Sequence, residues 1–246
     1  MRRSVPSRLI VVGLSVAILV ATAASPLVWA GGTDPDLTVT RGDFSTIGRV
    51  KPAVLDLALG AAACAVKSGV VESPATLTVI DYSLPSTAKR MWVYDLNART
   101  LVYEELVAHG SGTGDNLARD FSNTPESHQS SLGLYVTEEP YVGKNGYSLR
   151  MEGLDAGFND RARERAIVIH GAPYVSDSLA RSQGRLGRSW GCPAVRDVIA
   201  RSLIDRVKGG GLVFAYYPDP AFLAESKYVQ CANNQPKLPT DEAIAP

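Results

Sequence analysis

Residues 167–174 have the sequence IVIHGAPY, and residues 184–195 have the sequence GRLGRSWGCPAV. In the first stretch, an apolar triplet leads to His170, which is typical of a buried strand that ends beside an imidazole. In the second stretch, Cys192 lies in a glycine-rich turn. A cysteine and a histidine that meet in space can act as nucleophile and general base. These two stretches therefore predict both a strand-based core and a candidate active site.

The residues around the cysteine suit this chemistry. The thiolate is the reactive form of a cysteine, and neighbouring cations lower the pKa of a thiol. Arg185 and Arg188 precede Cys192 by a few residues, so we expect the local field to favour the anion. The backbone N–H groups of Gly191 and Cys192 are candidates to hold a developing oxyanion.

A non-enzymatic interpretation competes with this one. A single cysteine is often a small buried apolar residue, and a histidine after a strand is often a core residue. The protein would then be an exported binding or structural protein in which His170 and Cys192 only pack. Labelling with iodoacetamide distinguishes the two, because a catalytic cysteine is expected to react fast at neutral pH.

The motif HG at 170–171, followed by SWGCPA at 189–194, resembles the murein L,D-transpeptidase (YkuD-type) catalytic domain. The similarity covers approximately residues 77–217. Trp190 stands where many members have a second histidine, and Pro193-Ala194 stands where many have a residue followed by arginine. Supporting stretches are FSN at 121–123, SSLG at 130–133, GYSL at 146–149 and GL at 153–154.

The resemblance implies acyl transfer on the tetrapeptide stems of peptidoglycan. Cys192 would attack the carbonyl of the third stem residue, a meso-diaminopimelate, and expel the terminal D-alanine. The thioester would pass to an amine, giving a 3–3 cross-link or an exchanged D-amino acid, or to water. His170, oriented by backbone oxygens in the family, would be the base and then the acid.

The remaining site residues are assigned by the same resemblance. Gly191 and Gly171 are the backbone positions expected at the oxyanion. Arg188, Ser189 and Trp190 are the expected substrate-binding residues, with Arg188 on a substrate carboxylate. The alternative for Arg188 is a structural role on loop carbonyls.

Other cysteine enzymes stay open as alternatives. An L,D-carboxypeptidase or another cell-wall cysteine hydrolase would use the same pair with water as acceptor. Papain-like peptidases place the cysteine before the histidine, which is the reverse of the order here. Sortases have the order His, Cys, Arg, but their cysteine lies in a Thr-rich strand.

The first thirty residues predict an exported protein of the periplasm or cell envelope. A basic start precedes an apolar run from Leu9 to Ala24, and Val28-Trp29-Ala30 offers a cleavage site. The run of about 16 residues is shorter than the ~20 of a transmembrane helix. Membrane contact is expected only if this segment stays uncleaved. We divide the chain into a signal peptide (1–30), a flexible leader (31–49), a catalytic domain (50–217) and a loosely attached tail (218–246).

The charge balance argues against nucleic acid as a partner. The 25 basic and 25 acidic residues cancel, but three of the basic ones lie in 1–30. The remainder has 22 basic and 25 acidic residues, a net charge of −3. We expect a monomer whose partners are peptidoglycan stem peptides.

Three cysteines limit the covalent and metal chemistry. If Cys192 is the nucleophile, Cys64 and Cys231 either pair with each other or both stay free; the sequence favours neither. With no Cys-x-x-Cys motif, a zinc site of thiolates is not expected, and we predict no metal and no cofactor.

The patterns along the chain predict a mainly β fold, a meander or barrel-like sandwich. A helix is expected over 50–67, followed by strands near 77–82, 91–94, 100–107, 133–137, 147–151 and 212–217, with a second helix from Asp197 to Val207. The polar stretch 110–131 is expected to be a substrate-facing wall. His109 and His128 flank it; either could lie near the cysteine, but a surface or loop-ordering role is favoured for both. The arginines at 161, 163 and 165 alternate with acids, which indicates a solvated face.

Overall fold

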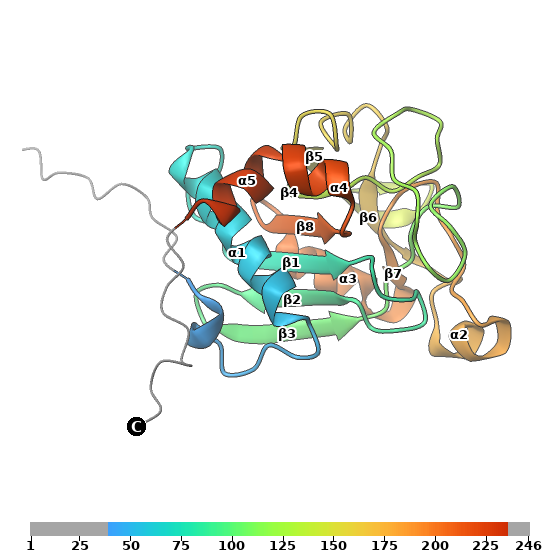
Figure 1. Cartoon of the computed structure of the whole chain (residues 1–246). Coiled ribbons are helices and arrows are strands. Elements are labelled where there is room, and N and C mark those ends of the chain that lie inside the picture. Colours follow the sequence, from blue (N-terminus) through green and yellow to red (C-terminus); the bar gives the residue numbers. More distant parts are fainter. Residues whose placement is uncertain (1–38, 236–246) are drawn as a thin grey trace, which may run out of the picture. The chain divides into compact units, whose positions relative to one another are not determined.

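The computed structural model describes residues 39–235 of the 246-residue chain. The expected signal peptide (1–30) and the last part of the expected tail (236–246) lie outside the described residues. An eight-stranded sheet forms the centre of the described part, with helices packed against it (Figure 1).

The strands follow one another in the sheet in the order β3-β2-β1-β8-β4-β5-β6-β7. β1 to β3 form the antiparallel meander that the alternation predicts. β1 pairs in parallel with β8, and β6 pairs in parallel with β7, so the sheet is mixed. The strands are β1 (Thr76–Asp81), β2 (Met91–Asp95), β3 (Thr100–Glu105), β4 (Gly133–Gly143), β5 (Gly146–Gly153), β6 (Val168–Ala172), β7 (Ala194–Arg196) and β8 (Leu212–Tyr216).

The two outer strands of this order meet at one point. Just past β3, the N–H of Ala108 donates to the oxygen of Ala194 in β7, at 2.8 Å. This bridge gives the sheet its barrel-like closure, because it joins the two ends of the strand order. The predicted mainly β, barrel-like fold is confirmed.

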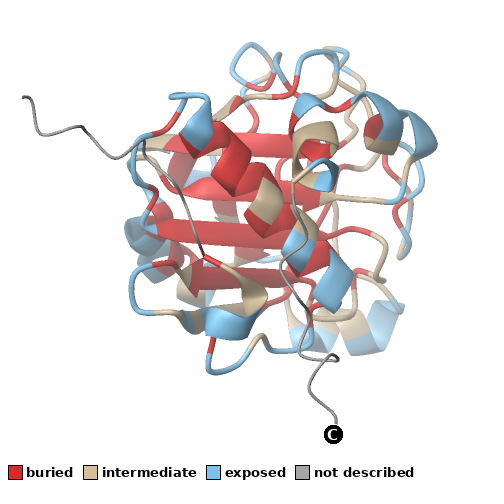
Figure 2. Cartoon of the chain, turned by 60° about the vertical axis from the view of Figure 1, so that its left-hand side comes forward, coloured by how far each residue is buried: buried red, intermediate tan, exposed pale blue. Residues whose placement is uncertain are grey.

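The helix α1 (Pro52–Lys67) confirms the first predicted helix. Proline suits its first turn, and Gly69 follows its end with a φ of +70°, which favours glycine. Buried apolar residues lie on several sides of α1, because this helix contacts β1 and β8 of the sheet as well as α5 (Lys227–Asn233). Figure 2 shows the buried part of α1 lying over the buried strands.

The helix α3 (Asp197–Val207) confirms the helix predicted after the cysteine. Asp197 is its first residue, whereas the cap position is Arg196. α3 packs on β6, with further contacts to β1 and β5, and lies behind the sheet in the view of Figure 1. All six residues of β1 are buried, because α1 and α3 both pack against that strand. The sequence analysis missed β7 and the short helix α2 (Asp177–Gln183).

The expectation of a flexible leader is wrong for residues 39–49. Val39 and Phe44 are buried, and a 3-10 turn, η1 (Arg41–Asp43), lies between them. The ring of Phe44 meets that of Tyr94 edge to face at 5.1 Å. The hydroxyl of Tyr94 donates to the oxygen of Ile47. Burial of these apolar side chains outweighs the polar composition on which the expectation rested.

The expectation of a loose tail is wrong for residues 218–235. The helices α4 (Pro220–Glu225) and α5 bury Phe222, Tyr228 and Val229. The hydroxyl of Ser226, between the helices, donates to the carboxylate of Asp155 at 2.7 Å. This segment is part of the core.

A disulfide joins Cys64 of α1 to Cys231 of α5. Of the two alternatives left open by the sequence, the paired one is confirmed. Cys192 is the free cysteine, and it is buried. Within the described residues, no helix combines the length and the apolar character needed to cross a membrane.

Removing this disulfide is expected to destabilise the protein. The bond closes a sequence separation of 167 residues, and the loss of a native disulfide costs about 2–5 kcal/mol. Cys64→Ser and Cys231→Ser should therefore each lower the midpoint of urea unfolding. The double variant should fall no further than either single one, and a midpoint equal to that of the wild type would contradict the stabilising role.

Candidate active site

His170 lies in the middle of β6, with its backbone held on both sides. It pairs with Ser148 of β5 and with Ala194 of β7. The Nδ1 atom lies 2.7 Å from the oxygen of Gly171. A carbonyl oxygen can only accept, so Nδ1 carries the hydrogen, and Nε2 keeps its lone pair. The local backbone therefore fixes the tautomer that a general base requires.

The surroundings of His170 keep the imidazole neutral. Burial lowers its pKa, and the hydrogen bond to Gly171 and the charge of Asp197 oppose that shift only in part. A lowered pKa leaves the ring uncharged at neutral pH and able to accept a proton.

Cys192 lies beside the beginning of β6. His170 pairs with Ala194 in the parallel β6–β7 ladder, so Cys192, two residues earlier, lies next to Val168. The thiol accepts from the Val168 N–H at 3.5 Å and donates to the oxygen of Ala166 at 3.7 Å. The structure thus places the two predicted residues on adjacent segments. Transfer of the thiol proton to Nε2 requires the thiol to leave Ala166.

The pKa of the Cys192 thiol is raised, contrary to expectation. Burial is the main cause, and the Val168 N–H and the charge of Arg165 oppose it only in part. Arg188 donates instead to Gly114 and to Asp115, and Arg185 donates to the oxygen of Leu186. The expectation that Arg185 and Arg188 favour the thiolate is therefore wrong.

Ser189 shapes the turn that carries the cysteine. Its hydroxyl donates to the oxygen of Cys192 at 2.6 Å and accepts from the N–H of Gly191 at 3.1 Å. Gly191 has a φ of +115°, and a Cβ there would lie 2.7 Å from the oxygen of Gln129, so only glycine fits. The N–H of Gly191 is engaged by Ser189, whereas the N–H of Cys192 acts on its own thiol, whose pKa it lowers.

Gly171 is required for packing. It lies inside β6, and a Cβ there would lie 2.7 Å from the Asp197 carboxylate and 2.9 Å from the Cβ of Ala200. The close approach of α3 to β6 therefore requires glycine at this position. The carbonyl oxygen of Gly171 accepts the hydrogen bond from Nδ1 of His170 and so orients the imidazole. The contact of Gly171 with the site is therefore made by a hydrogen-bond acceptor.

Trp190 is exposed and stacks on His128. The two ring centroids are 4.8 Å apart and the rings are 8° from parallel. The indole is 71% exposed, which is unusual for so large an apolar side chain. The pair forms an aromatic surface, and Trp190 lies two residues before Cys192.

His109 is buried and structural. Its Nδ1 accepts from the guanidinium of Arg90 at 2.7 Å, which leaves Nε2 to face the oxygen of Gly114 at 3.3 Å. Burial, together with the charge of Arg90, lowers the pKa of His109 to about 4. Its carbonyl accepts from the Ser189 N–H, so it orders the loops around the site.

Arg165 is the site residue that the sequence analysis missed. It is half-buried rather than on a solvated face, and its charge lowers the pKa of Cys192. Its neighbour Arg161 does pair with Glu164 at the surface, as the alternating charges indicate. Nothing in the charge pattern distinguishes the two arginines, because the difference arises from the turn that leads into β6.

No group of three or more metal-binding side chains occurs within residues 39–235.

A family model described as the L,D-transpeptidase catalytic domain matches residues 47–216, which is well over half of the chain. The chain belongs to this family. The match includes both stretches that carry His170 and Cys192, so the two residues of the candidate pair lie inside the L,D-transpeptidase domain.

The solved structures that match this chain include several L,D-transpeptidases. The enzyme from Mycobacterium smegmatis is 14% identical, with a TM-score of 0.35, over 58% of this chain and 59% of its own. The helical cell shape determining protein Pgp2 from Campylobacter jejuni is 14% identical, with a TM-score of 0.38, over 66% of this chain and 53% of its own. This chain thus spans little more than half the length of these proteins. A search of curated proteins finds no match.

The raised pKa of Cys192 predicts how the free thiol reacts with iodoacetamide. Only the thiolate reacts, so a pKa above the ordinary value of about 8.5 makes alkylation slow at neutral pH. The fast labelling expected above for a catalytic cysteine therefore does not distinguish the two interpretations of this buried thiol. The rate should go on increasing as the pH rises past this value. Mass spectrometry of the intact protein, with the disulfide left oxidised, reports Cys192 alone. A rate that already levels off near pH 7 would show that the thiolate is favoured instead.

Proposed function

We propose that this protein is an exported, cysteine-dependent L,D-transpeptidase that acts on the tetrapeptide stems of peptidoglycan. One observation carries the proposal. A free cysteine in the family's domain lies beside the strand that holds a histidine, and the tautomer of that histidine leaves Nε2 unprotonated. The proposed base therefore comes from β6, and the proposed nucleophile comes from the turn just before β7.

The first half of the reaction forms a thioester. Nε2 of His170 takes the thiol proton as Sγ of Cys192 attacks the carbonyl carbon of the third stem residue. The negative charge that develops on the carbonyl oxygen would be held by the N–H of Cys192. Collapse of this intermediate breaks the amide bond, and the imidazolium gives its proton to the departing D-alanine.

The second half releases the enzyme. The amine of another stem attacks the thioester carbonyl and loses its proton to Nε2, and the thiol is restored as Sγ leaves. The product is a 3–3 cross-link. A free D-amino acid as acceptor gives exchange, and water gives hydrolysis, which is the reaction of an L,D-carboxypeptidase.

Burial suits this sequence of steps. Thiol and imidazole are both neutral before the substrate binds, because burial raises the pKa of Cys192 and lowers that of His170. The proton then moves during the attack rather than before it. The closed setting also protects the thiol from oxidation between turnovers.

Three residues are proposed to contact the substrate. Trp190 offers an exposed ring face beside the nucleophile. Arg188 is 28% exposed and paired with the exposed carboxylate of Asp115, which a substrate carboxylate could replace. Ser189 would act by holding the turn in place, since its hydroxyl is engaged on both sides.

Two features support a location in the cell envelope. The sequence of residues 1–30 is typical of a secretory signal. The disulfide between Cys64 and Cys231 forms in oxidising compartments and is rare in the cytosol.

Cys192→Ala should abolish release of D-alanine from a disaccharide tetrapeptide while the fold is kept. Substitution of one small buried side chain costs about 0.5–3 kcal/mol, so circular dichroism should stay unchanged. Mass spectrometry of muropeptides measures both D-alanine loss and 3–3 dimers. Val70→Ala, at an exposed position after α1, is the control. Turnover retained by folded Cys192→Ala would end the cysteine mechanism.

His170→Gln should slow acylation of Cys192 by at least a hundredfold, since a positioned general base contributes about 10²–10⁴ in rate. His128→Gln is the matched control, because His128 lies in a loop and makes its aromatic contact with Trp190. It should cost far less. Stopped-flow measurement of acylation with both variants separates the roles. Equal losses in two well-folded variants would show that His170 is not the base.

A further inference from the structure

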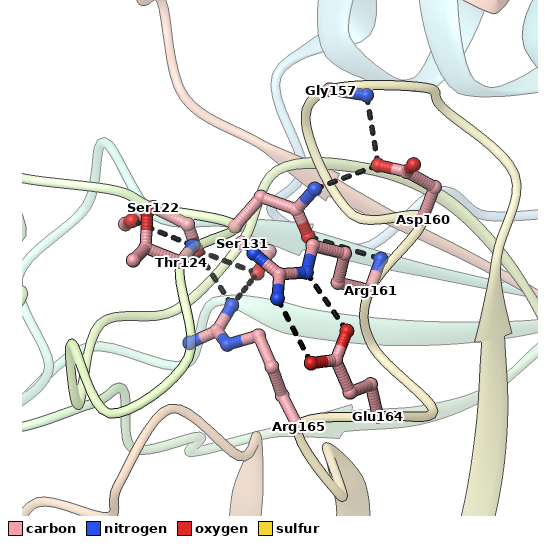
Figure 3. Close-up of polar contacts among 9 residues, drawn as sticks. Ser122, Thr124, Ser131, Gly157, Asp160, Arg161, Glu164 and Arg165 are labelled. Carbon is pink, nitrogen blue, oxygen red and sulfur yellow. Dashed lines mark hydrogen bonds and ion pairs between the residues drawn. The ribbon is translucent and has the colours of Figure 1, made fainter.

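The guanidinium of Arg165 binds the loop that precedes β4. Nη1 donates to the oxygen of Ser122 at 2.6 Å and to the hydroxyl of Ser131, as Figure 3 shows. Nη2 donates to the oxygen of Gln129 at 2.6 Å and to the hydroxyl of Ser127 at 3.3 Å. One side chain thus ties four points of this wall loop to the turn that leads into β6.

The charge of Arg165 is not cancelled by a neighbouring acid. Its four acceptors are neutral carbonyls and hydroxyls, and within residues 39–235 it forms no ion pair. The two preceding arginines do form ion pairs: Arg161 with Glu164, drawn in Figure 3, and Arg163 with Glu138. Arg165 is therefore a half-buried cation that is surrounded by neutral hydrogen-bond acceptors and has no acidic partner among the described residues.

This cation lies against the turn that carries the nucleophile. A Cβ on Gly191 would lie 3.3 Å from Nη2 of Arg165, so the guanidinium is in contact range of the residue before Cys192. The residue after Arg165 is Ala166, which has a φ of +52° and whose oxygen accepts from the thiol. Such strained residues cluster at functional sites. The same turn thus carries both the guanidinium of Arg165 and the carbonyl oxygen that accepts the hydrogen bond from the thiol.

Two phenols lie close enough to the thiol for the charges to interact, Tyr82 just after β1 and Tyr174 just after β6. His170, on the neighbouring β6, is neutral because burial lowers its pKa. Burial raises the pKa of Tyr82 and of Tyr174 to about 12 each, so both phenols stay protonated. The charge of Arg165 lowers the pKa of Cys192, against the larger effect of burial.

We propose that Arg165 is a positioning residue of the active site, which fixes the wall loop against Gly191 and favours the Cys192 thiolate through its uncancelled charge. The proposal rests on the proposed function only for the role of Cys192 as nucleophile. Arginine and lysine share the charge but not the planar fork of donors, so the two effects can be separated.

The test is the rate at which iodoacetamide alkylates Cys192 at about pH 8, where the rate is proportional to the thiolate fraction. Arg165→Gln removes the charge, and loss of a nearby opposite charge raises a pKa by about one unit or more. Its rate should therefore fall at least about tenfold. Arg165→Lys keeps the charge and should stay within about threefold of the wild type.

Arg161→Gln is the matched control, because it removes a surface charge four residues away and should change the rate by less than about twofold. A wild-type rate in folded Arg165→Gln would overturn the proposal. An equal loss in Arg165→Lys and Arg165→Gln would overturn the role of the charge and leave only the contacts with the loop.

If Arg165→Gln does not fold, Arg165→Lys and Ser131→Ala decide the question. Both keep the cation and should keep the wild-type alkylation rate, so a tenfold loss in folded Arg165→Lys would refute the charge effect. Alkylation needs no peptidoglycan. The result therefore stands whether or not the wild type releases D-alanine.

Discussion

The parallel pairing of β6 with β7 is the constraint on which the site depends. His170 and Cys192 are 22 positions apart in the sequence, and the register that sets His170 opposite Ala194 brings the thiol beside Val168. β7 also closes the barrel, through the bridge from Ala194 to Ala108. A shift of one residue would turn the side chains of β6 to the opposite face. The register of three residues therefore determines both the closure of the sheet and the candidate chemistry.

Burial at this point sets the electrostatic character of the site. It raises the pKa of the thiol and lowers that of the imidazole, so both are uncharged at rest. A site built in this way depends on backbone dipoles and on nearby charge for the transition state. The carbonyl of Gly171 orients the His170 ring, the hydroxyl of Ser189 holds the turn, and Arg165 is the cation whose charge acts on the thiol.

The outer elements hold this arrangement together from both ends of the described chain. Phe44 packs on Tyr94 near the beginning, and α5 is bonded to α1 by the disulfide near the end. The buried carboxylate of Asp155 accepts from Ser226 and from the N–H of Leu134, which joins the C-terminal helices to β4. Composition alone indicated loose segments at both places. That prediction failed because a few buried apolar side chains stabilise a segment more than its polar majority suggests.

The sequence by itself determined the local elements and the chemical pair. Alternating or continuous runs of apolar residues predicted seven of the strands, and the HG and SWGC motifs pointed to His170 and Cys192 as the candidate pair, because periodicity and short motifs are properties of neighbouring residues. The tertiary structure decided what depends on distant partners. It paired Cys64 with Cys231, paired Arg188 with Asp115 and brought Arg165 close to Cys192. It also set the pKa shifts, because burial is a property of the packed fold and not of the local sequence.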